Sequence, residues 1–411
     1  MTEQQLPITT ADADDWPEIS RLIAAAFHEA HDPTAREGDH VVFEPDRSLL
    51  VRDGGTVVAH ASAYTRELTV PGAVLPAAHV TQVAVAPTHR RNRLLTRLMT
   101  RQLREVRDAG TEYLAVLWAS EGRIYPRFGY GQAAQRLTME ADLRELRLPE
   151  PPASVGGRLR TGEPAALADE LARVYEDVRV NRPGWSSRAD RHWRARLTDP
   201  SALRFGATER RAVLHEGPGG VDGYALWRTH SEWDRSGPRG TTRVEEVVAD
   251  TPAAYLALWR LLFTIDLTRR LSYPFAAVDE PLLRLVDEPR RLDAQLVDAL
   301  WLRLVNVPAA LAARRYAAPV DVVIEVTDPL LPENAGRWRL TGGPDGARCV
   351  PADEPAELAC DVRDLGELYL GGTALSALVA AGRVRELRPG AARSATTGFG
   401  WYRAPVGIEV F

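Results

Sequence analysis

The sequence predicts an α/β protein with mixed sheets, in which one strand–helix unit occurs twice and a smaller α+β domain follows. Three observations support this prediction. Strand-like and helix-like segments alternate along the chain, a Pro/Gly-rich segment lies at 148–157, and the pattern of 80–99 recurs at 244–262. A chain of 411 residues is long enough for two or three domains. We therefore predict domains at 1–150, 151–290 and 291–411.

The first region contains a helix, a hairpin and a strand–helix–strand unit. Residues 14–27 (DDWPEISRLIAAAF) have acidic capping residues, a proline in the first turn and an apolar face, which predict a helix. The polar, acidic segment 28–47 predicts a loop. Two β-rich runs joined by Asp-Gly-Gly predict a hairpin over 48–68. The remaining elements are expected to be a strand at 80–86, a helix from about 91 to 107 and a buried strand at 111–119.

The second and third regions follow from repetition and from a change of pattern. Residues 221–230 resemble the second hairpin strand, and 244–262 repeat the rhythm of a strand followed by an amphipathic helix. This second copy has Pro-Ala-Ala at 252–254 where the first has arginines, so we expect it to lack an anion site. Alternating segments at 319–328 and 337–343, with helical patterns at 364–387, predict the smaller α+β domain.

Composition excludes several classes of protein. A net charge of -5 disfavours a non-specific nucleic-acid binder. No apolar run approaches a membrane span, and the polar, acidic start lacks a basic signal region, so we predict a cytoplasmic protein without a membrane partner. The two cysteines, Cys349 and Cys360, lack metal-type spacing and are predicted to be structural. With no HExxH or CxxC motif, we predict no metal cofactor.

An arginine-rich joint lies between the strand and the helix of the first copy. The stretch VTQVAVAPTHRRNRLLTRLM spans 80–99 and places three arginines at the helix start. A helix N-terminus offers free N–H groups and a partial positive charge, so it binds phosphate readily. The sequence therefore predicts an anion site at this joint.

These residues also carry a family resemblance. Val83-Ala84-Val85 with the run from Arg90 to Leu95 resembles the acetyl-CoA signature Q/R-x-x-G-x-G/A of the GNAT acetyltransferases. Together with ASEGRIYPRFGYG, LWLRLVNVPAALAARRY and an aromatic last residue, essentially the whole chain resembles the Eis (enhanced intracellular survival) family of aminoglycoside and lysine N-acetyltransferases. The resemblance implies two GNAT-like domains, a sterol-carrier-like C-terminal domain, acetyl-CoA as co-substrate and a homo-oligomer, commonly a hexamer.

The resemblance assigns the coenzyme A site to the first copy. The pyrophosphate is expected on the amides of residues 91–96, with Arg90 or Arg91 adding charge, and the pantetheine arm along the strand at 83–85. Arg93 stands where the family has glycine, so it either narrows the approach or adds a cation. Leu95 stands where many GNAT enzymes have Gly or Ala. The candidate cofactor residues are Val83, Ala84, Val85, Arg90, Arg91, Asn92, Arg93, Leu94, Leu95, Thr96, Ser120 and Glu121.

The resemblance also implies an acid and a base. Tyr125, in GRIYPRFGYG, matches the family's general acid, with Tyr130 as a rival; packing of a loop by both rings is the alternative. The C-terminal carboxylate, here that of Phe411, matches the general base. The apolar ending at Val406, Ile408, Val410 and Phe411 predicts a tucked-in terminus. Packing of a final strand, and Glu409 as the base, are the alternatives.

Acceptor contacts are predicted from charge and position. Glu29 and the acidic loop residues Asp32, Glu37 and Asp39 are expected to receive a polycation, with a solvated surface as the alternative. Gln82 is expected to face the acceptor, and His89 to be a turn residue.

Three functional hypotheses follow. The first is an N-acetyltransferase that uses acetyl-CoA to modify amines of polycationic small molecules, namely aminoglycosides or polyamines, and protein lysines as a further candidate. The second is a non-catalytic acyl-CoA-binding or scaffold protein with a degenerate GNAT site. The third is a lipid carrier that acts through the C-terminal domain.

Overall fold

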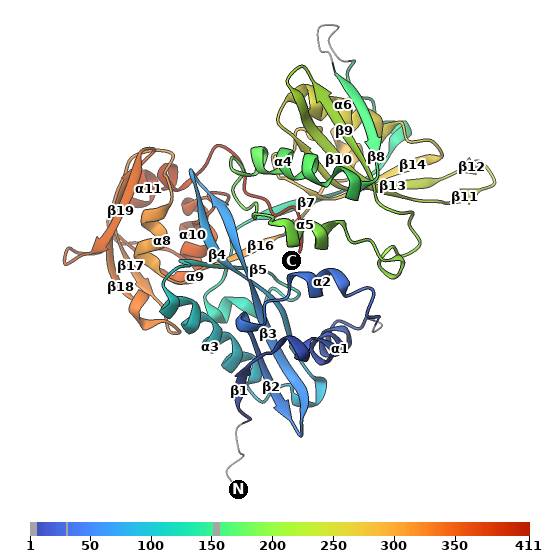
Figure 1. Cartoon of the computed structure of the whole chain (residues 1–411). Helices are drawn as coiled ribbons and strands as arrows, with labels where there is room; N and C mark the ends of the chain where they lie inside the picture. Colours follow the sequence, from blue (N-terminus) through green and yellow to red (C-terminus); the bar gives the residue numbers. More distant parts are fainter. Residues whose placement is uncertain (1–5, 30–31, 151–156) are drawn as a thin grey trace. The chain divides into compact units, whose positions relative to one another are not determined.

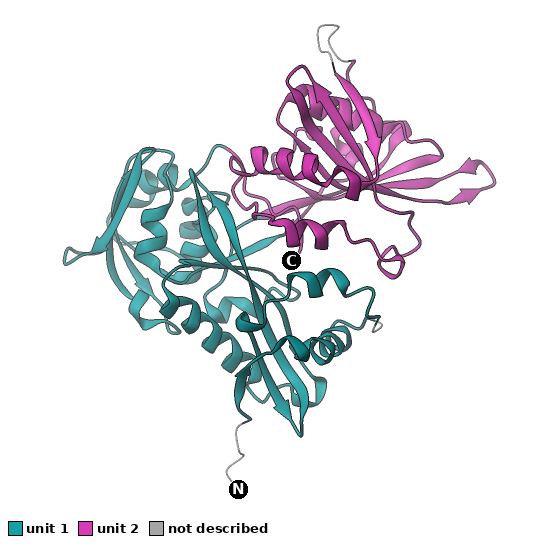
Figure 2. Cartoon of the chain, in the orientation of Figure 1, with its two compact units in different colours: residues 1–134, 299–402, 411 teal, residues 135–298, 403–410 magenta. Residues whose placement is uncertain are grey.

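The computed structural model describes residues 6–29, 32–150 and 157–411. Most of the Pro/Gly-rich segment, at 151–156, lies outside the described residues. The chain forms two compact units (Figure 2). Unit 1 comprises residues 1–134, 299–402 and 411, and unit 2 comprises 135–298 and 403–410. The chain thus passes between the units at 134/135 and 298/299, whereas the domain boundaries predicted from sequence lie at 150/151 and 290/291.

Unit 1 contains a seven-stranded mixed sheet (Figure 1). In spatial order its strands are β1 (Ile8–Thr10), β2 (Ser48–Asp53), β3 (Thr56–Val70), β4 (Ala73–Val85), β5 (Leu114–Trp118), β16 (Leu300–Leu304) and β6 (Gly131–Gln132). The β4–β5 pair is parallel and the other neighbours are antiparallel. The predicted hairpin at 48–68 is confirmed as β2 and β3.

Two helices cover opposite faces of this sheet. Helix α1 (Trp16–Ala26) packs against Leu50 and Val57, while α3 (Leu94–Ala109) packs against Leu49 and Val58. Adjacent strand residues point to opposite faces, so the two helices lie on different sides. The segment predicted as a loop contains a short helix, α2 (Glu37–Val42), whose single buried residue is Val42. Its mostly polar composition gave no helical periodicity.

The last part of unit 1 is a five-stranded sheet with four helices. Its strands, in spatial order, are β19 (Gly346–Pro351), β18 (Gly336–Gly343), β17 (Val320–Thr327), β20 (Leu358–Asp361) and β21 (Arg385–Glu386). The helices are α8 (Val307–Ala313), α9 (Val362–Leu368), α10 (Leu375–Ala380) and α11 (Ala391–Phe399). One apolar core joins Leu68 and Val116 of the first sheet to Ile324 and Leu340 of this one. Cys349 and Cys360 are buried and free.

A buried arginine caps the C-terminal ends of two of these helices. Arg314 is fully buried, and its guanidinium donates to the carbonyl of Tyr369 at 2.6 Å and to that of Phe399 at 3.0 Å. These carbonyls lie at the C-terminal ends of α9 and α11, where the helix dipoles carry partial negative charge. The arrangement satisfies a buried cation with carbonyl groups and the rings of Tyr316, Tyr369 and Phe399.

Unit 2 repeats the mixed seven-stranded sheet. In spatial order its strands are β15 (Gln295–Asp298), β7 (Gln135–Asp142), β14 (Thr268–Ala276), β13 (Gly240–Ala249), β10 (Gly220–His230), β9 (Arg211–Gly217) and β8 (Arg158–Gly162). A small hairpin pairs β11 (Trp233–Asp234) with β12 (Gly237–Pro238). The helices are α4 (Ala168–Arg179), α5 (Asp190–Leu197), α6 (Pro252–Phe263) and α7 (Leu282–Leu285). Again one central pair, β13–β14, is parallel.

The internal repeat seen in the sequence is therefore confirmed. In each sheet a long strand pairs in parallel with its neighbour over only a few residues, at Ala77–His79 of β4 and at 240–243 of β13. Each long strand then runs six residues further, to Val85 or Ala249, paired on its other side. The pairing of β4 with β5 ends at His79, so the rest of β4 has no ladder partner on that side in the described part of the chain.

Candidate active site

The last six residues of β4 form the part of the strand that β5 does not pair with. The ladder with β3 is interrupted by a bulge, because Thr81 pairs with Ser62 and Ala84 with His60. Gln82 lies in the bulge with a φ of 53°. Its carbonyl bonds the Nδ1 of buried His60 at 2.9 Å. The predicted pantetheine strand, Val83–Val85, lies just beyond the bulge at the end of β4.

The arginine turn precedes α3 instead of forming its first turn. The helix was expected from about 91, but it begins at Leu94 because Arg91 and Arg93 have φ values of 67° and 58°. Such left-handed residues stop a helix from extending backwards. The side chains from Arg90 to Arg93 are exposed, as is Thr96, while Leu94 is buried and Leu95 partly buried. His89 bonds Asp53 of the hairpin turn at 3.0 Å, as expected of a turn residue.

The geometry of Arg93 gives a reason for the glycine in the family pattern. Its φ of 58° falls in the region that glycine adopts at no steric cost. Helix α3, all of whose residues are described, receives no side-chain cap. Its first amides therefore remain available next to exposed arginines, which is suitable for a phosphate group.

Two tyrosines lie after β5. Tyr125 begins a 3-10 helix, Tyr125–Phe128, and is 6% exposed. Burial, with a smaller contribution from Glu121, raises the pKa of the Tyr125 hydroxyl to about 12. The Tyr130 ring lies edge-on at 6.0 Å, is fully buried, and burial raises its pKa further. Ser120 and Glu121 are exposed in the loop between β5 and Tyr125.

Phe411 contacts the middle of β4. The Thr81 hydroxyl donates to a main-chain oxygen of Phe411 at 2.8 Å, and the His79 ring lies edge-on to the Phe411 ring at 4.7 Å. Val80, between these two residues, packs in the same apolar cluster as Tyr125. The expected tucked-in ending is partly wrong. Val406 and Ile408 are buried, whereas Val410 is 61% exposed, and residues 403–411 form no strand.

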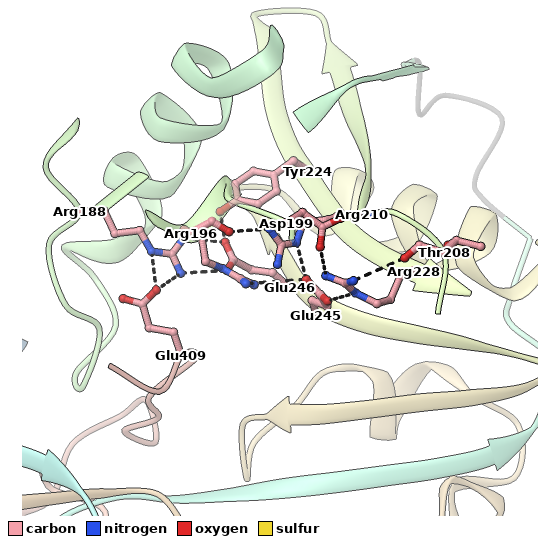
Figure 3. Close-up of polar contacts among 10 residues, drawn as sticks. All are labelled: Arg188, Arg196, Asp199, Thr208, Arg210, Tyr224, Arg228, Glu245, Glu246 and Glu409. Carbon is pink, nitrogen blue, oxygen red and sulfur yellow. Dashed lines mark hydrogen bonds and ion pairs between the residues drawn. The ribbon is translucent and has the colours of Figure 1, made fainter. Parts of the chain in front are cut away.

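The alternative base, Glu409, belongs to a network of ions in unit 2 (Figure 3). Arg188, whose side chain is fully buried, contacts Glu409 at 2.7 Å and binds Glu246 through two bonds of 2.9 Å. Four arginines and four carboxylates are drawn there with Tyr224 and Thr208: Arg188, Arg196, Arg210, Arg228, Asp199, Glu245, Glu246 and Glu409. The Glu409 carboxylate is thus bound to the Arg188 guanidinium within unit 2.

The predicted acceptor residues fall into two groups. Glu29 and Asp39 both bind Arg36, so much of their charge is neutralised within the loop. Asp32 accepts from the Thr34 amide at 2.8 Å. The Gln82 amide donates to the Tyr64 hydroxyl at 3.1 Å. Burial raises the pKa of Tyr64, and Asp39 contributes to the rise, so this tyrosine lies between the acidic loop and the bulge.

A cavity that sequence reasoning missed lies beside the acidic loop. It measures about 340 Å³ and is lined by Trp16, Pro17, Ser20, Pro33, Thr34, Arg36, Glu37 and His40. The rings of Trp16 and His40 stack at 5.4 Å. Trp16 belongs to the apolar core around α1 and also lines this cavity. Thr81 and His79 were missed because they read as ordinary strand residues.

Comparisons with known proteins agree with this geometry. Acetyltransferase (GNAT) domain models match residues 7–133 and 184–304, and a sterol carrier protein domain model matches 307–406. An uncharacterized N-acetyltransferase of Streptomyces avermitilis is 46% identical over 394 residues, covering 95% of this chain and 96% of its own. The N-acetyltransferase Eis of Mycobacterium tuberculosis is 38% identical over 384 residues, covering 90% and 91%.

A solved structure extends the likeness to the whole chain. Eis1 from Mycobacterium abscessus matches with a TM-score of 0.83 and 33% identity, covering 98% of this chain and 100% of its own. The chain belongs to the Eis-like N-acetyltransferases of the GNAT superfamily. The predicted architecture of two GNAT domains followed by a sterol-carrier-like domain is confirmed.

Two further observations concern this Eis-like enzyme. Within residues 6–29, 32–150 and 157–411, no group of three or more His, Cys, Asp or Glu side chains is arranged to hold a metal ion. In the described part of the chain, no helix is both long and apolar enough to cross a lipid bilayer.

Proposed function

We propose that this enzyme transfers the acetyl group of acetyl-CoA to primary amines of polycationic acceptors, with aminoglycosides as the first class to test. Polyamines and protein lysines are further candidates. The observation that supports this most is the position of β4: its end is unpaired on the β5 side and leads into the arginine turn, while its middle contacts both the Tyr125 cluster and Phe411.

The coenzyme A site proposed is the one derived from the sequence. The pyrophosphate would bind the α3 amides and the side chains of Arg90 and Arg91, while Arg93 adds a third exposed cation. The pantetheine would lie along Val83–Val85, whose main-chain groups pair as an added strand does. One amide there would polarise the thioester carbonyl. Ser120 and Glu121 would flank the cofactor from the β5 side.

The proposed reaction is a direct attack of the amine on the thioester. The amine nitrogen forms a bond to the acetyl carbon, and its proton passes to the Phe411 carboxylate. The carbon–sulfur bond then breaks, and the leaving thiolate takes the Tyr125 proton. Solvent removes the first proton and restores the second. A pKa of about 12 keeps Tyr125 protonated at neutral pH, as an acid requires.

The cavity beside α1 and α2 is the proposed acceptor site. Its stacked Trp16 and His40 rings offer a face to a sugar or a cation, and Glu37 adds negative charge at its edge. Glu29 and Asp39 would bind an acceptor amine by exchanging their contact with Arg36 for one with the substrate. Gln82 would orient the amine from the bulge. We further propose, from the family resemblance, a cytoplasmic homohexamer.

The test is acetyl-CoA turnover, followed by thiol release, with aminoglycosides, polyamines and lysine peptides. Tyr125→Phe removes only the acid, and a chain extended by three residues beyond Phe411 moves the carboxylate. Each change should lower kcat by about 100-fold or more, because general acid–base steps contribute that much. Tyr130→Phe is the matched control, since the Tyr130 hydroxyl has no hydrogen-bond partner among the described residues.

The outcomes separate the hypotheses. Collapse of turnover in both variants, with Tyr130→Phe unaffected, supports the proposed acid and base. Binding of acetyl-CoA without turnover on any acceptor would instead favour the non-catalytic acyl-CoA binder. Absence of binding would overturn the cofactor assignment.

A further inference from the structure

The last residue, Phe411, contacts two strands of unit 1, β3 and β4. Thr81 and His79 of β4 contact its main-chain oxygen and its ring, at 2.8 Å and 4.7 Å. Arg66 of β3 places its guanidinium carbon 5.9 Å from the centre of the same ring. Chain termini usually fray, so three contacts of different chemistry on one terminal residue need an explanation.

The position of Thr81 on β4 is specific. It lies two residues beyond His79, the last residue of β4 that pairs with β5, and one residue before the Gln82 bulge. Its own ladder partner is Ser62. Thr81 is therefore held rigidly by β3 at the point where β4 and β5 separate. A hydroxyl fixed there can hold a terminal group beside the unpaired part of β4.

The hydrogen bond also has an electrostatic effect. Where Phe411 ends the protein, as the proposed function assigns it, the oxygen that Thr81 contacts belongs to the α-carboxylate. A donated hydrogen bond stabilises the ionised carboxylate, and it fixes one oxygen so that the other can point towards a substrate. The effect is useful only if this carboxylate takes part in the reaction.

We propose that Thr81 is a positioning residue for the terminal carboxylate, and that His79 and Arg66 select an aromatic last residue. This inference rests on the proposed function, which assigns the Phe411 carboxylate as general base. Thr81 does not touch the reacting atoms in this scheme. It holds the base in the orientation in which a free oxygen meets the amine proton.

The charged and titratable groups around Phe411 come from two strands. Arg66 and Tyr64 lie on β3, and His79, the ladder partner of Tyr64, lies on β4. A test must leave these three residues unchanged. Thr81→Val preserves the shape of the side chain but removes the hydroxyl, while Thr81→Ser keeps the hydroxyl and is the matched control.

Kinetics give the first readout. Thr81→Val should lower kcat about 10- to 100-fold, as expected for loss of a hydrogen bond to a charged group, with the KM for acetyl-CoA unchanged. Thr81→Ser should stay within a few-fold of the parent enzyme. If both variants lose activity equally, or if Thr81→Val retains full kcat, Thr81 is not a positioning residue.

A spectroscopic readout does not depend on activity. The carbonyl carbons of the eight phenylalanines can be labelled with ¹³C, and Phe411→Leu identifies the terminal signal by its loss. Titration should show a higher carboxyl pKa in Thr81→Val than in Thr81→Ser, because the stabilising donor is gone. An unchanged carboxyl pKa would overturn the inference. If the carboxyl pKa rises in Thr81→Val as expected but the parent protein turns over no acceptor, the proposed function is overturned instead.

The ring contacts have their own test. Phe411→Ala keeps the carboxylate but removes the contacts with His79 and Arg66, and it should lower kcat about 10-fold. Val410→Ala is the control, because the Val410 side chain is mostly exposed, and it should leave kcat unchanged. Equal kcat for Phe411→Ala and the parent would exclude selection of an aromatic terminus.

Discussion

The two mixed sheets share a plan but differ at the point where a ligand would bind. In both, a long strand leaves its parallel neighbour after a short pairing and is followed by an amphipathic helix. The helix after β4 has an uncapped start with exposed arginines, whereas α6 is capped by Thr251, which accepts from the Ala254 amide at 3.1 Å. Thr251 in turn donates to Asp222 at 2.9 Å. A carboxylate so close to a helix start repels an anion.

The two long strands also differ in the polar groups at their bulges. In β4 the carbonyl of Gln82, at the bulge, is hydrogen-bonded to the Nδ1 of buried His60. In β13 it falls at Glu245, next to Glu246, and arginines surround both carboxylates (Figure 3). The two sheets therefore share a fold but differ in how the groups at these positions are paired: the α3 start receives no side-chain cap, whereas the α6 start and the β13 bulge are bound by side chains of unit 2. We accordingly propose that only the first sheet binds coenzyme A.

Breaking the ion network should have the largest effect on stability. Glu246→Gln leaves the buried Arg188 guanidinium partly uncompensated, and should lower the free energy of unfolding by about 3–5 kcal/mol. Thermal unfolding would measure this loss, and the acetyl-CoA KM of the folded variant should not change. Glu105→Gln, at an exposed pair on α3, is the control. A large rise in KM would show that the second sheet takes part in cofactor binding.

The two sheets should lose stability in different pH ranges as the solution is acidified. Burial lowers the pKa of His60 to about 4, so the fold around β4 loses stability as pH falls from about 6.5 to 4, by about 3 kcal/mol. Burial would raise the pKa of Glu245, but Arg196, Arg210 and Arg228 outweigh it and lower the pKa to about 2. Its contribution is therefore lost only below about pH 4.5.

Hydrogen exchange of peptides from β4 and β13, corrected for intrinsic rates, measures the pH range of stability loss for each strand separately. His60→Asn should abolish the loss near β4 and leave β13 as before. Simultaneous loss of protection in both strands at one pH would contradict the separation.

Removing the exposed arginines of the turn should weaken the binding of acetyl-CoA and leave the other steps unchanged. The double change Arg90→Ala and Arg91→Ala should raise the KM for acetyl-CoA about 10- to 100-fold, since charge-assisted bonds are lost, and should reduce its salt dependence. Arg104→Ala, an exposed arginine on the same helix, controls for general charge. An equal effect of Arg104→Ala would mean that the turn has no specific role.

The smallest effect is expected at Arg93, where the first sheet departs from its family. Arg93→Gly should stabilise the fold by about 1 kcal/mol, because glycine relieves the left-handed conformation. It should also raise the acetyl-CoA KM a few-fold through loss of a cation. A lower KM in this variant would show that the arginine narrows the approach instead. Denaturant unfolding and steady-state kinetics measure the two effects independently.

Much of the fold followed from the sequence because periodicity and turn residues are local signals. The Asp-Gly-Gly turn at 53–55 placed the hairpin, and the repeat placed α6 and β13. The start of α3 was predicted three residues too early, because only tertiary structure holds Arg91 and Arg93 at positive φ. The bulge at Gln82 and the contact of Thr81 with Phe411 join residues far apart in sequence, and no local pattern announces either.

The return of the chain through β16 has a consequence for synthesis on the ribosome. Strand β16 (Leu300–Leu304) is buried and lies between β5 and β6. The seven strands of the unit 2 sheet all lie within 135–298, so the later sheet is complete in the nascent chain before the earlier one. Until residue 304 emerges, β5 is an open edge, a feature that invites pairing with other chains. All strands of the second sheet are therefore available for pairing while the first sheet still has an unpaired edge, although the core of unit 2 is completed only when Val406 and Ile408 emerge.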